Sequence, residues 1–317
     1  MVRRVMRKDD NKKRCNMNVL VATDGSKYGQ WGLNWVATLP FVKPPRVTAL
    51  HVLDSAWLRG PFRTRPEILR VEARSARTLK KAKQQLASLK LEGTVRKEQG
   101  AVAPVILKRA PKRDGLLVVG SKGLDALDRF MLGSVATKLI QHATCPVLVV
   151  KGEAVPVRRM ILATDGSPAS ATALEFVLTR FQPDRSTDKG GRRPIHVSVI
   201  HVMAPNPWMK SQELKEANLK LIDQNVRKLI KAGFAAEPLY QLGKPAEEIM
   251  KVAAKQHADL IVMGAQGLGA MARFLLGSVS TRVVQHATCA VLVVRSQREK
   301  HRGTLDRFPG VSSGVIG

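Results

Sequence analysis

Two glycine-rich motifs carry the residues of this sequence that are best suited to chemistry. The first, GSKGLDALDRFMLGS, spans residues 120–134, and the second, GAQGLGAMARFLLGS, spans residues 264–278. Both have the spacing Gly-x2-Gly-x9-Gly-Ser and follow an apolar run. Glycine lets backbone N–H groups approach an anion closely, and a helix start adds unpaired N–H groups and the positive end of the helix dipole. The motifs therefore predict an internal repeat with two phosphate-binding sites.

A second repeated motif, Thr-Asp-Gly-Ser, follows the first apolar run of each half, at residues 23–26 and 164–167. Its serine is well placed to cap a following helix. Its aspartate has two interpretations. The carboxylate is an acceptor for hydroxyl or amino groups of a ligand, or Asp-Gly simply forms the turn. The sequence leaves both interpretations open.

Apolar runs alternate with helical patterns through both halves. In the first half we expect strands at 17–22, 47–53, 94–98, 116–119 and 147–150, with helices at 31–39, 66–91 and 134–142. In the second half we expect strands at 160–163, 195–203, 237–241, 260–263 and 291–294, with helices at 171–181, 211–232 and 278–286. A further helix is expected before the fourth strand of each half. This order predicts an α/β fold with two tandem Rossmann-like open sheets of five parallel strands and helices on both faces. Ligands of such sheets bind beyond the carboxyl ends of the strands, where both repeated motifs fall.

The chain length of 317 residues suits two domains. We expect the first domain at 17–151 and the second at 158–295, joined by a short linker that keeps them packed together. The polar, basic or glycine-rich ends, 1–16 and 296–317, are expected to be disordered tails.

The chain is strongly basic, with 53 lysine and arginine residues against 25 acidic ones and a formal net charge of +28. Such a charge predicts attraction to polyanions or acidic membrane surfaces at low salt. Aromatic residues make up only 4% of the chain, which argues against stacking platforms for single-stranded nucleic acid. We interpret the charge first as a solvated basic surface and keep a nucleic-acid partner as an alternative.

Three cysteines, at positions 15, 145 and 289, cannot build a disulfide framework, which fits a reducing cytoplasm. The basic N-terminal segment has no apolar core of a signal peptide, and no apolar run approaches the roughly 18 residues of a membrane span. We therefore expect a cytoplasmic protein with no membrane partner.

Other chemistry finds little support in the sequence. His142-x2-Cys145 and His286-x2-Cys289 resemble half of a metal site, but no second ligand pair is evident, so no metal site is predicted. The Walker motif is missing, and so is the dinucleotide fingerprint after the first strand. No pairing of a nucleophile with a base repeats in both halves, so we assign no catalytic residue. His51 and His201 are expected to be packed within strands.

With these motifs in this order, the chain resembles the universal stress protein family in a tandem form with two complete domains. The resemblance covers about residues 17–151 and 158–295. It rests on Asp24 and Asp165, on a repeated His-Val pair, and above all on the two glycine motifs, each followed by HATC and a valine-rich strand. Family members that keep this glycine pattern bind ATP.

The resemblance implies a binding site for an adenine nucleotide in each copy. In the first copy, Ala22, Thr23, Asp24 and Val52 would border adenine and ribose, and Gly120, Gly123, Gly133, Ser134 and Val135 would hold ribose and phosphates. The matching residues of the second copy are Ala163, Thr164, Asp165, Val202, Gly264, Gly267, Gly277, Ser278 and Val279. Mg²⁺ is expected to bind through the phosphates and not in a protein cage.

By the same resemblance we expect a nucleotide-dependent stress-response or regulatory protein, in which ATP occupancy switches a conformation that protein partners recognise. The enzymatic alternative is slow ATP hydrolysis or self-phosphorylation, and a second alternative is a basic protein associated with nucleic acid. Similar proteins dimerise through their last strands. We therefore expect 147–150 and 291–294 to face each other within one chain as a pseudo-dimer, which leaves a homodimer of chains open.

The two copies also differ from each other. The segment expected to form the helix before the fourth strand carries Pro104, Pro111 and Gly115 in copy one and has lost the acidic residues of copy two, and Pro111 is expected to break or kink the helix. Within the glycine motifs, Lys122 stands where copy two has Gln266, so the first site is expected to carry one more positive charge.

Overall fold

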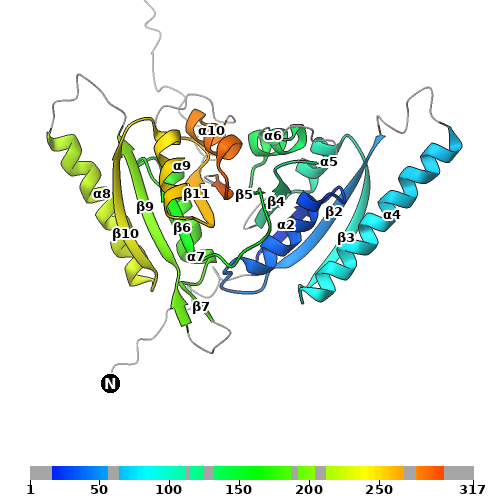
Figure 1. The fold of residues 1–317 in the computed structure, drawn as a ribbon, viewed down its shortest axis with the longest axis horizontal. Helices are drawn as coiled ribbons and strands as arrows, with labels where there is room; N and C mark the ends of the chain where they lie inside the picture. Colours follow the sequence, from blue (N-terminus) through cyan, green and yellow to red (C-terminus); the bar gives the residue numbers. More distant parts are fainter. Residues whose placement is uncertain are drawn as a thin grey trace, which may run out of the picture.

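The computed structural model describes residues 16–55, 64–111, 115–123, 132–186, 192–203, 212–267 and 276–295. Ten strands form one sheet in the order β10-β9-β6-β11-β12-β5-β4-β1-β2-β3 (Figure 1). The expected tails lie outside the described residues, apart from Asn16. Within this sheet, neighbouring strands are parallel throughout each half, which confirms the predicted fold class.

Both halves repeat the same order of elements. The first half contains β1 (Asn18–Ala22), α2 (Lys27–Thr38), β2 (Arg46–Asp54), α4 (Arg65–Ser88), β3 (Gly93–Gly100), α5 (Val102–Arg109), β4 (Gly115–Gly120), α6 (Ser134–His142) and β5 (Val147–Val150). The second half contains β6 (Arg159–Ala163), α7 (Pro168–Arg180), β9 (His196–Met203), α8 (Gln212–Lys231), β10 (Ala235–Leu242), α9 (Pro245–Lys255), β11 (Leu260–Gly264), α10 (Ser278–His286) and β12 (Ala290–Val294). A small antiparallel hairpin of β7 (Asp184–Ser186) and β8 (Arg192–Pro194) interrupts this repeat.

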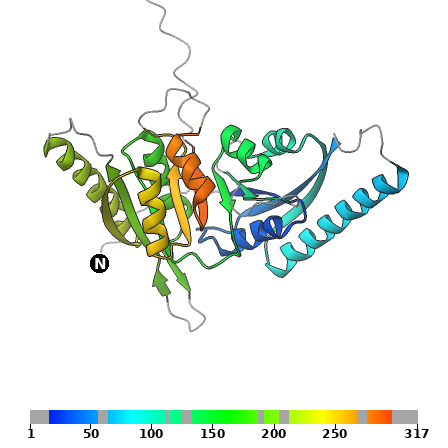
Figure 2. The ribbon, with the colours of Figure 1, turned by 45° about the horizontal axis from the view of Figure 1, so that its top comes forward.

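The sheet separates two hydrophobic cores, one on each face. Alternate side chains of β1 enter different cores, Val19 and Val21 on one face and Leu20 on the other. Buried side chains of α2, α4, α7 and α8 belong to the first core, and those of α5, α6, α9 and α10 belong to the second. The helices therefore cover both faces, as predicted from the crossover order (Figure 2).

The two halves join through their last strands. β5 and β12 pair antiparallel, with Leu148 opposite Leu292 at the centre of the pair. The two predicted sheets thus form one continuous sheet, and the expected pairing within one chain is confirmed. A second contact lies at the ends of α2 and α7, where Phe41 and Phe181 form a bridge with ring centroids 5.9 Å apart.

Each half contributes one cationic side chain that contacts the end of a helix in the other half. Arg295, directly after β12, donates from Nη2 to the backbone oxygens of Ile140 and Gln141 at the end of α6. Lys151, directly after β5, donates from Nζ to the backbone oxygen of Gln285 at the end of α10, at 3.1 Å. The last carbonyl groups of a helix lack partners and carry partial negative charge, so both contacts are favourable. Burial lowers the pKa of Lys151 to about 8, and nearby Lys122 acts in the same direction.

Replacing Arg295 by methionine should weaken this junction. The carbonyl groups of Ile140 and Gln141 would lose their charged donor in a half-buried place, which costs about 2 kcal/mol of unfolding free energy. Arg295→Lys, the side chain that copy one has at this position, should keep most of that stability. Urea unfolding of both variants tests the contact, and a methionine variant as stable as the wild type would contradict it.

Candidate functional site

Both repeated motifs lie where the strand order of each half reverses. In copy one, β1 lies between β2 and β4, so the chain leaves the sheet in opposite directions on the two sides of β1. The carboxyl ends of β1 and β4 lead into residues 23–26 and 120–123. β6 and β11 are arranged in the same way in copy two. This is the place where open α/β sheets bind their ligands.

A backbone hydrogen bond closes each glycine motif on itself. The N–H of Gly133 donates to the carbonyl oxygen of Ser121 at 2.8 Å, and Gly277 donates to Ala265 at the same distance. The start of α6 is thereby held against the end of β4, and the start of α10 against the end of β11. Residues 124–131 and 268–275, inside the motifs, lie outside the described residues.

The helix starts present unpaired backbone donors next to the strand ends. The first bond of α6 runs from the N–H of Thr137 to the oxygen of Gly133, so the N–H groups of Ser134 and Val135 have no partner within the helix. A Cβ atom at Gly133 would lie 3.5 Å from the Cα of Lys122 and 3.8 Å from the nitrogen of Gly123. Glycine therefore leaves open the space between the helix start and the loop.

The same arrangement occurs in copy two, around Gly277. A Cβ atom there would lie 3.5 Å from the Cα of Gln266 and 3.6 Å from the nitrogen of Gly267. The helix starts at Ser278, which is exposed like Ser134. We call the space around Gly123, Gly133 and Ser134, and its counterpart around Gly267, Gly277 and Ser278, the two cradles.

The aspartates of the Thr-Asp-Gly-Ser turns serve the turn and also reach the cradles. Asp24 Oδ1 accepts a hydrogen bond from the N–H of Ser26 at 2.9 Å, which is the turn chemistry that Asp-Gly predicts. Its other oxygen, Oδ2, would lie only 3.0 Å from a Cβ atom at Gly123. The corresponding distance between Asp165 Oδ2 and a Cβ atom at Gly267 is 2.6 Å. The second glycine of each motif therefore makes room for a carboxylate beside the cradle.

The serines of these turns cap the next helix, as predicted. Ser26 Oγ accepts from the N–H of Gly29 at 3.2 Å, and Ser167 Oγ accepts from the N–H of Ser170 at 3.2 Å. These caps fix the first turns of α2 and α7, which pack against Gly120 and Gly264 at the starts of the glycine motifs.

The first glycine of each motif has a packing role that sequence reasoning missed. A Cβ atom at Gly120 would lie 2.7 Å from Cβ and 3.0 Å from the carbonyl carbon of Tyr28 in α2. At Gly264 it would lie 2.7 Å from the carbonyl carbon of Ala169 in α7. Gly120 and Gly264 thus allow a helix to pack closely on a strand. No local signal could reveal this, because each contact joins segments about a hundred residues apart.

The remaining predicted residues lie at the strand ends, on the neighbouring strands and in the first turns of α6 and α10. Ala22 and Ala163 are buried at the strand ends, and Val52 and Val202 are half-buried on the neighbouring strands β2 and β9. Val135 and Val279 are half-buried in the first turns of α6 and α10. Thr23 is held by a bond from its N–H to the oxygen of Leu50, and Thr164 by a bond to Ile200. Each copy therefore combines an apolar wall with the backbone donors of its cradle.

The two strand histidines are buried and packed, as expected. His51 Nδ1 lies 2.9 Å from the carbonyl oxygen of Thr23, and His201 Nδ1 lies 2.9 Å from that of Thr164. A carbonyl oxygen only accepts, so each Nδ1 carries the proton. These bonds fix the start of both turns.

Comparison with known proteins agrees with the repeat. The model of the universal stress protein family matches residues 16–151 and 156–295. The chain belongs to this family. A universal stress protein of Mycolicibacterium smegmatis is 29% identical over 313 residues, covering 87% of this chain and 96% of the relative. One from Mycobacterium tuberculosis is 27% identical over 310 residues, covering 90% and 99%.

A solved structure shares the complete tandem fold. The crystal structure of a universal stress protein from Archaeoglobus fulgidus superposes with a TM-score of 0.66 at 20% identity, covering 88% of this chain and 96% of that chain. At this identity the likeness concerns the fold. Among the described residues of this universal stress protein, no helix is long and apolar enough to cross a membrane.

The cysteines of the two HATC segments are buried thiols. Burial raises the pKa of Cys145 and of Cys289 to about 11. Both thiols therefore stay protonated at neutral pH. The described part of the chain contains no group of three or more His, Cys, Asp or Glu side chains that could hold a metal ion.

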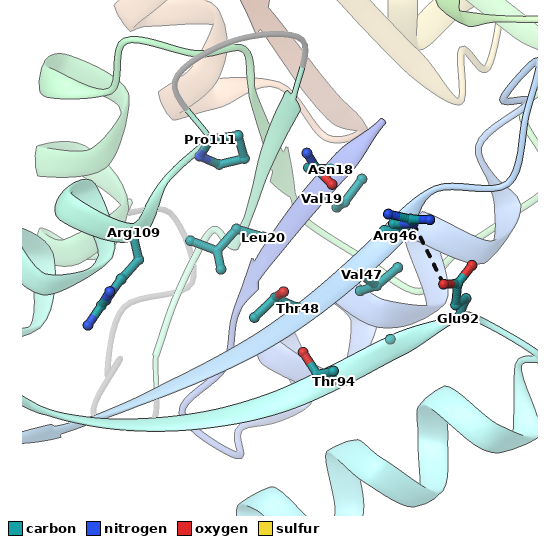
Figure 3. Close-up of a pocket in the computed structure, with 11 residues that line it drawn as sticks. Asn18, Val19, Leu20, Arg46, Val47, Thr48, Glu92, Thr94, Arg109 and Pro111 are labelled. Carbon is teal, nitrogen blue, oxygen red and sulfur yellow. Dashed lines mark ion pairs between the residues drawn. The ribbon is translucent and has the colours of Figure 1, made fainter. Parts of the chain in front are cut away.

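A separate groove lies at the amino ends of β1, β2 and β3, away from the cradles (Figure 3). Its volume is about 500 Å³, and Thr48, Thr94 and Pro111 line it. The predicted helix break is confirmed, because α5 ends at Arg109. In copy two α9 continues to Lys255, and the next residue, Gln256, donates to Glu237 at 3.3 Å. The groove thus follows from the shorter helix of copy one.

The two kinds of glycine should respond differently to alanine. Gly120→Ala should lower the unfolding free energy by about 1 to 3 kcal/mol, because its Cβ atom would overlap Tyr28. Gly133→Ala should cost less, below about 1 kcal/mol, since its contacts are of ordinary length and its φ of −62° suits any residue, so the loss is limited to the poorer capping of α6 by alanine. Urea unfolding measures both changes, and equal losses would contradict the assignment.

The buried thiols predict a loss of stability at alkaline pH. An unfolded cysteine ionises near its ordinary pKa of 9.0, whereas Cys145 and Cys289 in the folded chain keep their protons to about pH 11. Stability from these groups is therefore present below pH 9 and falls as the pH rises through 11. Unfolding free energies measured across this range should fall less steeply for the Cys145→Ala/Cys289→Ala variant, and parallel curves would contradict the burial argument.

Proposed function

We propose that each half of this universal stress protein binds an adenine nucleotide, ATP with Mg²⁺, at its cradle. The observation that supports this most directly is the open space at Gly133 and Gly277, bordered by helix N–H groups and by the backbone of Gly123 and Gly267. Backbone donors at a helix start are suited to phosphate oxygens. Gly133 and Gly277 would keep a side chain out of the place that a phosphate needs.

In this proposal the rest of the site holds the nucleoside. The apolar wall of Ala22 and Val52 would face the adenine, and Thr23 and Asp24 would present polar groups to the base and ribose. The exposed hydroxyl groups of Ser134 and Ser278 would add donors to the phosphates. Mg²⁺ would neutralise phosphate charge and be held by phosphate oxygens.

The two sites should differ in affinity because their cradles differ in charge. Lys122 follows β4 in copy one, where Gln266 follows β11 in copy two. Lys151 lies close enough to Lys122 for its pKa to be lowered by that charge. We propose that site one binds ATP more tightly than site two does. Lys122→Gln should bring the two affinities closer together.

We further propose that nucleotide occupancy is the regulatory signal. A ligand that binds only the folded chain stabilises it by mass action, and phosphates bound at the starts of α6 and α10 would fix the glycine motifs in one arrangement. The protein would act in the cytoplasm as a stress-response protein, with protein partners that recognise the occupied form and with pairing of two chains as a further level of assembly.

Aspartate substitutions at the helix starts test the proposal. Aspartate is a good N-cap, so Gly133→Asp should keep α6 intact, while its negative charge in the cradle repels phosphates. Isothermal titration with ATP and Mg²⁺ should give two sites for the wild type, one for Gly133→Asp or Gly277→Asp, and none for the double variant.

Gly133→Asn is the matched control, because asparagine has nearly the same size and capping ability without the charge. Both side chains enter the space that glycine leaves open, so both variants should bind ATP more weakly, and a clearly larger loss for Gly133→Asp than for Gly133→Asn would identify repulsion of an anion. If Gly133→Asp bound ATP as the wild type does, the proposed site would be wrong.

The enzymatic alternative has its own measurement. Mass spectrometry of the bound nucleotide after prolonged incubation distinguishes intact ATP from ADP, and the protein mass shows whether a phosphate was transferred to the chain. We expect intact ATP. Phosphate loss that disappears in the double aspartate variant would make the protein a slow ATPase.

A further inference from the structure

We propose that α4 carries a docking surface for the phosphate backbone of double-stranded nucleic acid. This surface consists of Arg70, Arg74, Arg77 and Lys81, and we call it the α4 stripe. Its four residues are not among those assigned to the nucleotide sites, and the proposal goes beyond the function proposed for those sites. In both views α4 lies at the end of the molecule farthest from the second half (Figures 1 and 2).

The four cations form one row along the helix. Their spacing of four, three and four residues places them on one side of α4, and all four are exposed. At 1.5 Å of rise per residue, the row is about 16 Å long. Such a row matches several consecutive phosphates along one strand of a nucleic acid.

Neighbouring acidic groups do not neutralise the row. Helix α4 carries seven lysine and arginine residues against two glutamates, Glu67 and Glu72. None of the four cations takes part in an ion pair among the described residues. Arg77 has only a local bond, from Nε to the carbonyl oxygen of Ala73. The charge of the stripe therefore faces solvent.

The second half shows that the fold does not require this charge. A Cβ atom at Gly25 would meet Thr78 of α4, and one at Gly166 would meet Leu221 of α8, so these two helix positions correspond. The α8 residues that correspond to the stripe are Glu213, Ala217, Lys220 and Gln224. The stripe has four positive charges in copy one and no net charge at the same positions in copy two.

The composition of α4 favours duplex nucleic acid over an anionic lipid surface or a single-stranded nucleic acid. Its apolar side, with Ala82 and Leu86, is buried in the core that α4 shares with α2, α7 and α8. No apolar face is therefore left to enter a lipid surface. One large apolar side chain, Leu69, is 57% exposed, which is too little for an anchor. The helix contains no aromatic residue on which single-stranded bases would stack.

Fluorescence anisotropy with a labelled DNA duplex, measured over a series of salt concentrations, tests the proposal. The variant Arg70→Gln/Arg74→Gln/Arg77→Gln/Lys81→Gln removes the stripe with good helix formers at exposed positions. Each lost phosphate contact should lower the slope of log affinity against log salt by about 0.9, so the variant should lose about 3 to 4 units of slope. Its affinity at 0.1 M salt should fall by at least about tenfold.

The matched control removes four exposed cations from α8, as Lys220→Gln/Arg227→Gln/Lys228→Gln/Lys231→Gln. It has the same net charge as the stripe variant and should bind the duplex nearly as the wild type does. Circular dichroism should show both variants folded.

Three results would overturn the proposal. The first is an equal loss of duplex affinity in the two variants, which would show that only net charge matters. The second is no duplex binding by the wild type at 0.1 M salt. The third is tighter binding to vesicles of anionic phospholipid or to single-stranded DNA than to the duplex.

Discussion

The candidate sites depend on one hydrogen bond in each half, which holds the start of a helix against the end of a central strand. Gly133 donates to Ser121, and Gly277 donates to Ala265. Because of these bonds, unpaired N–H groups of a helix start lie beside the glycine that follows the strand. A phosphate would be held there by backbone groups. The chemistry of the site thus rests on chain geometry, and few side chains are needed.

The junction between the halves connects this geometry across the molecule. Helix α6 starts at one cradle and ends at Arg295 of the other half, while α10 starts at the other cradle and ends at Lys151. Each helix therefore starts at the candidate anion site of its own half and ends at a cation that follows the last strand of the other half. The antiparallel pairing of β5 and β12 brings these helix ends and cations of the two halves together within a single chain. The tandem form thus builds into one chain a contact between two similar domains.

The sequence was sufficient for features with local or periodic signals. Apolar runs alternating with helical patterns predicted the strands, the crossovers and the place of both glycine motifs, and Pro111 predicted the short α5. The hairpin of β7 and β8 was missed, because its charged residues have no apolar alternation. The packing role of Gly120 and the contacts of Arg295 were missed as well. Their partners lie about 90 to 155 residues away, and only the folded chain brings them together.

A crystal structure of the protein with ATP and Mg²⁺ in excess would show whether the cradles hold the triphosphate. We expect phosphate oxygens within hydrogen-bond distance of the backbone nitrogens of Gly123 and Ser134, and of Gly267 and Ser278. A nucleotide bound elsewhere, or cradles filled by side chains of the protein itself, would show that backbone groups at these helix starts do not hold the phosphates.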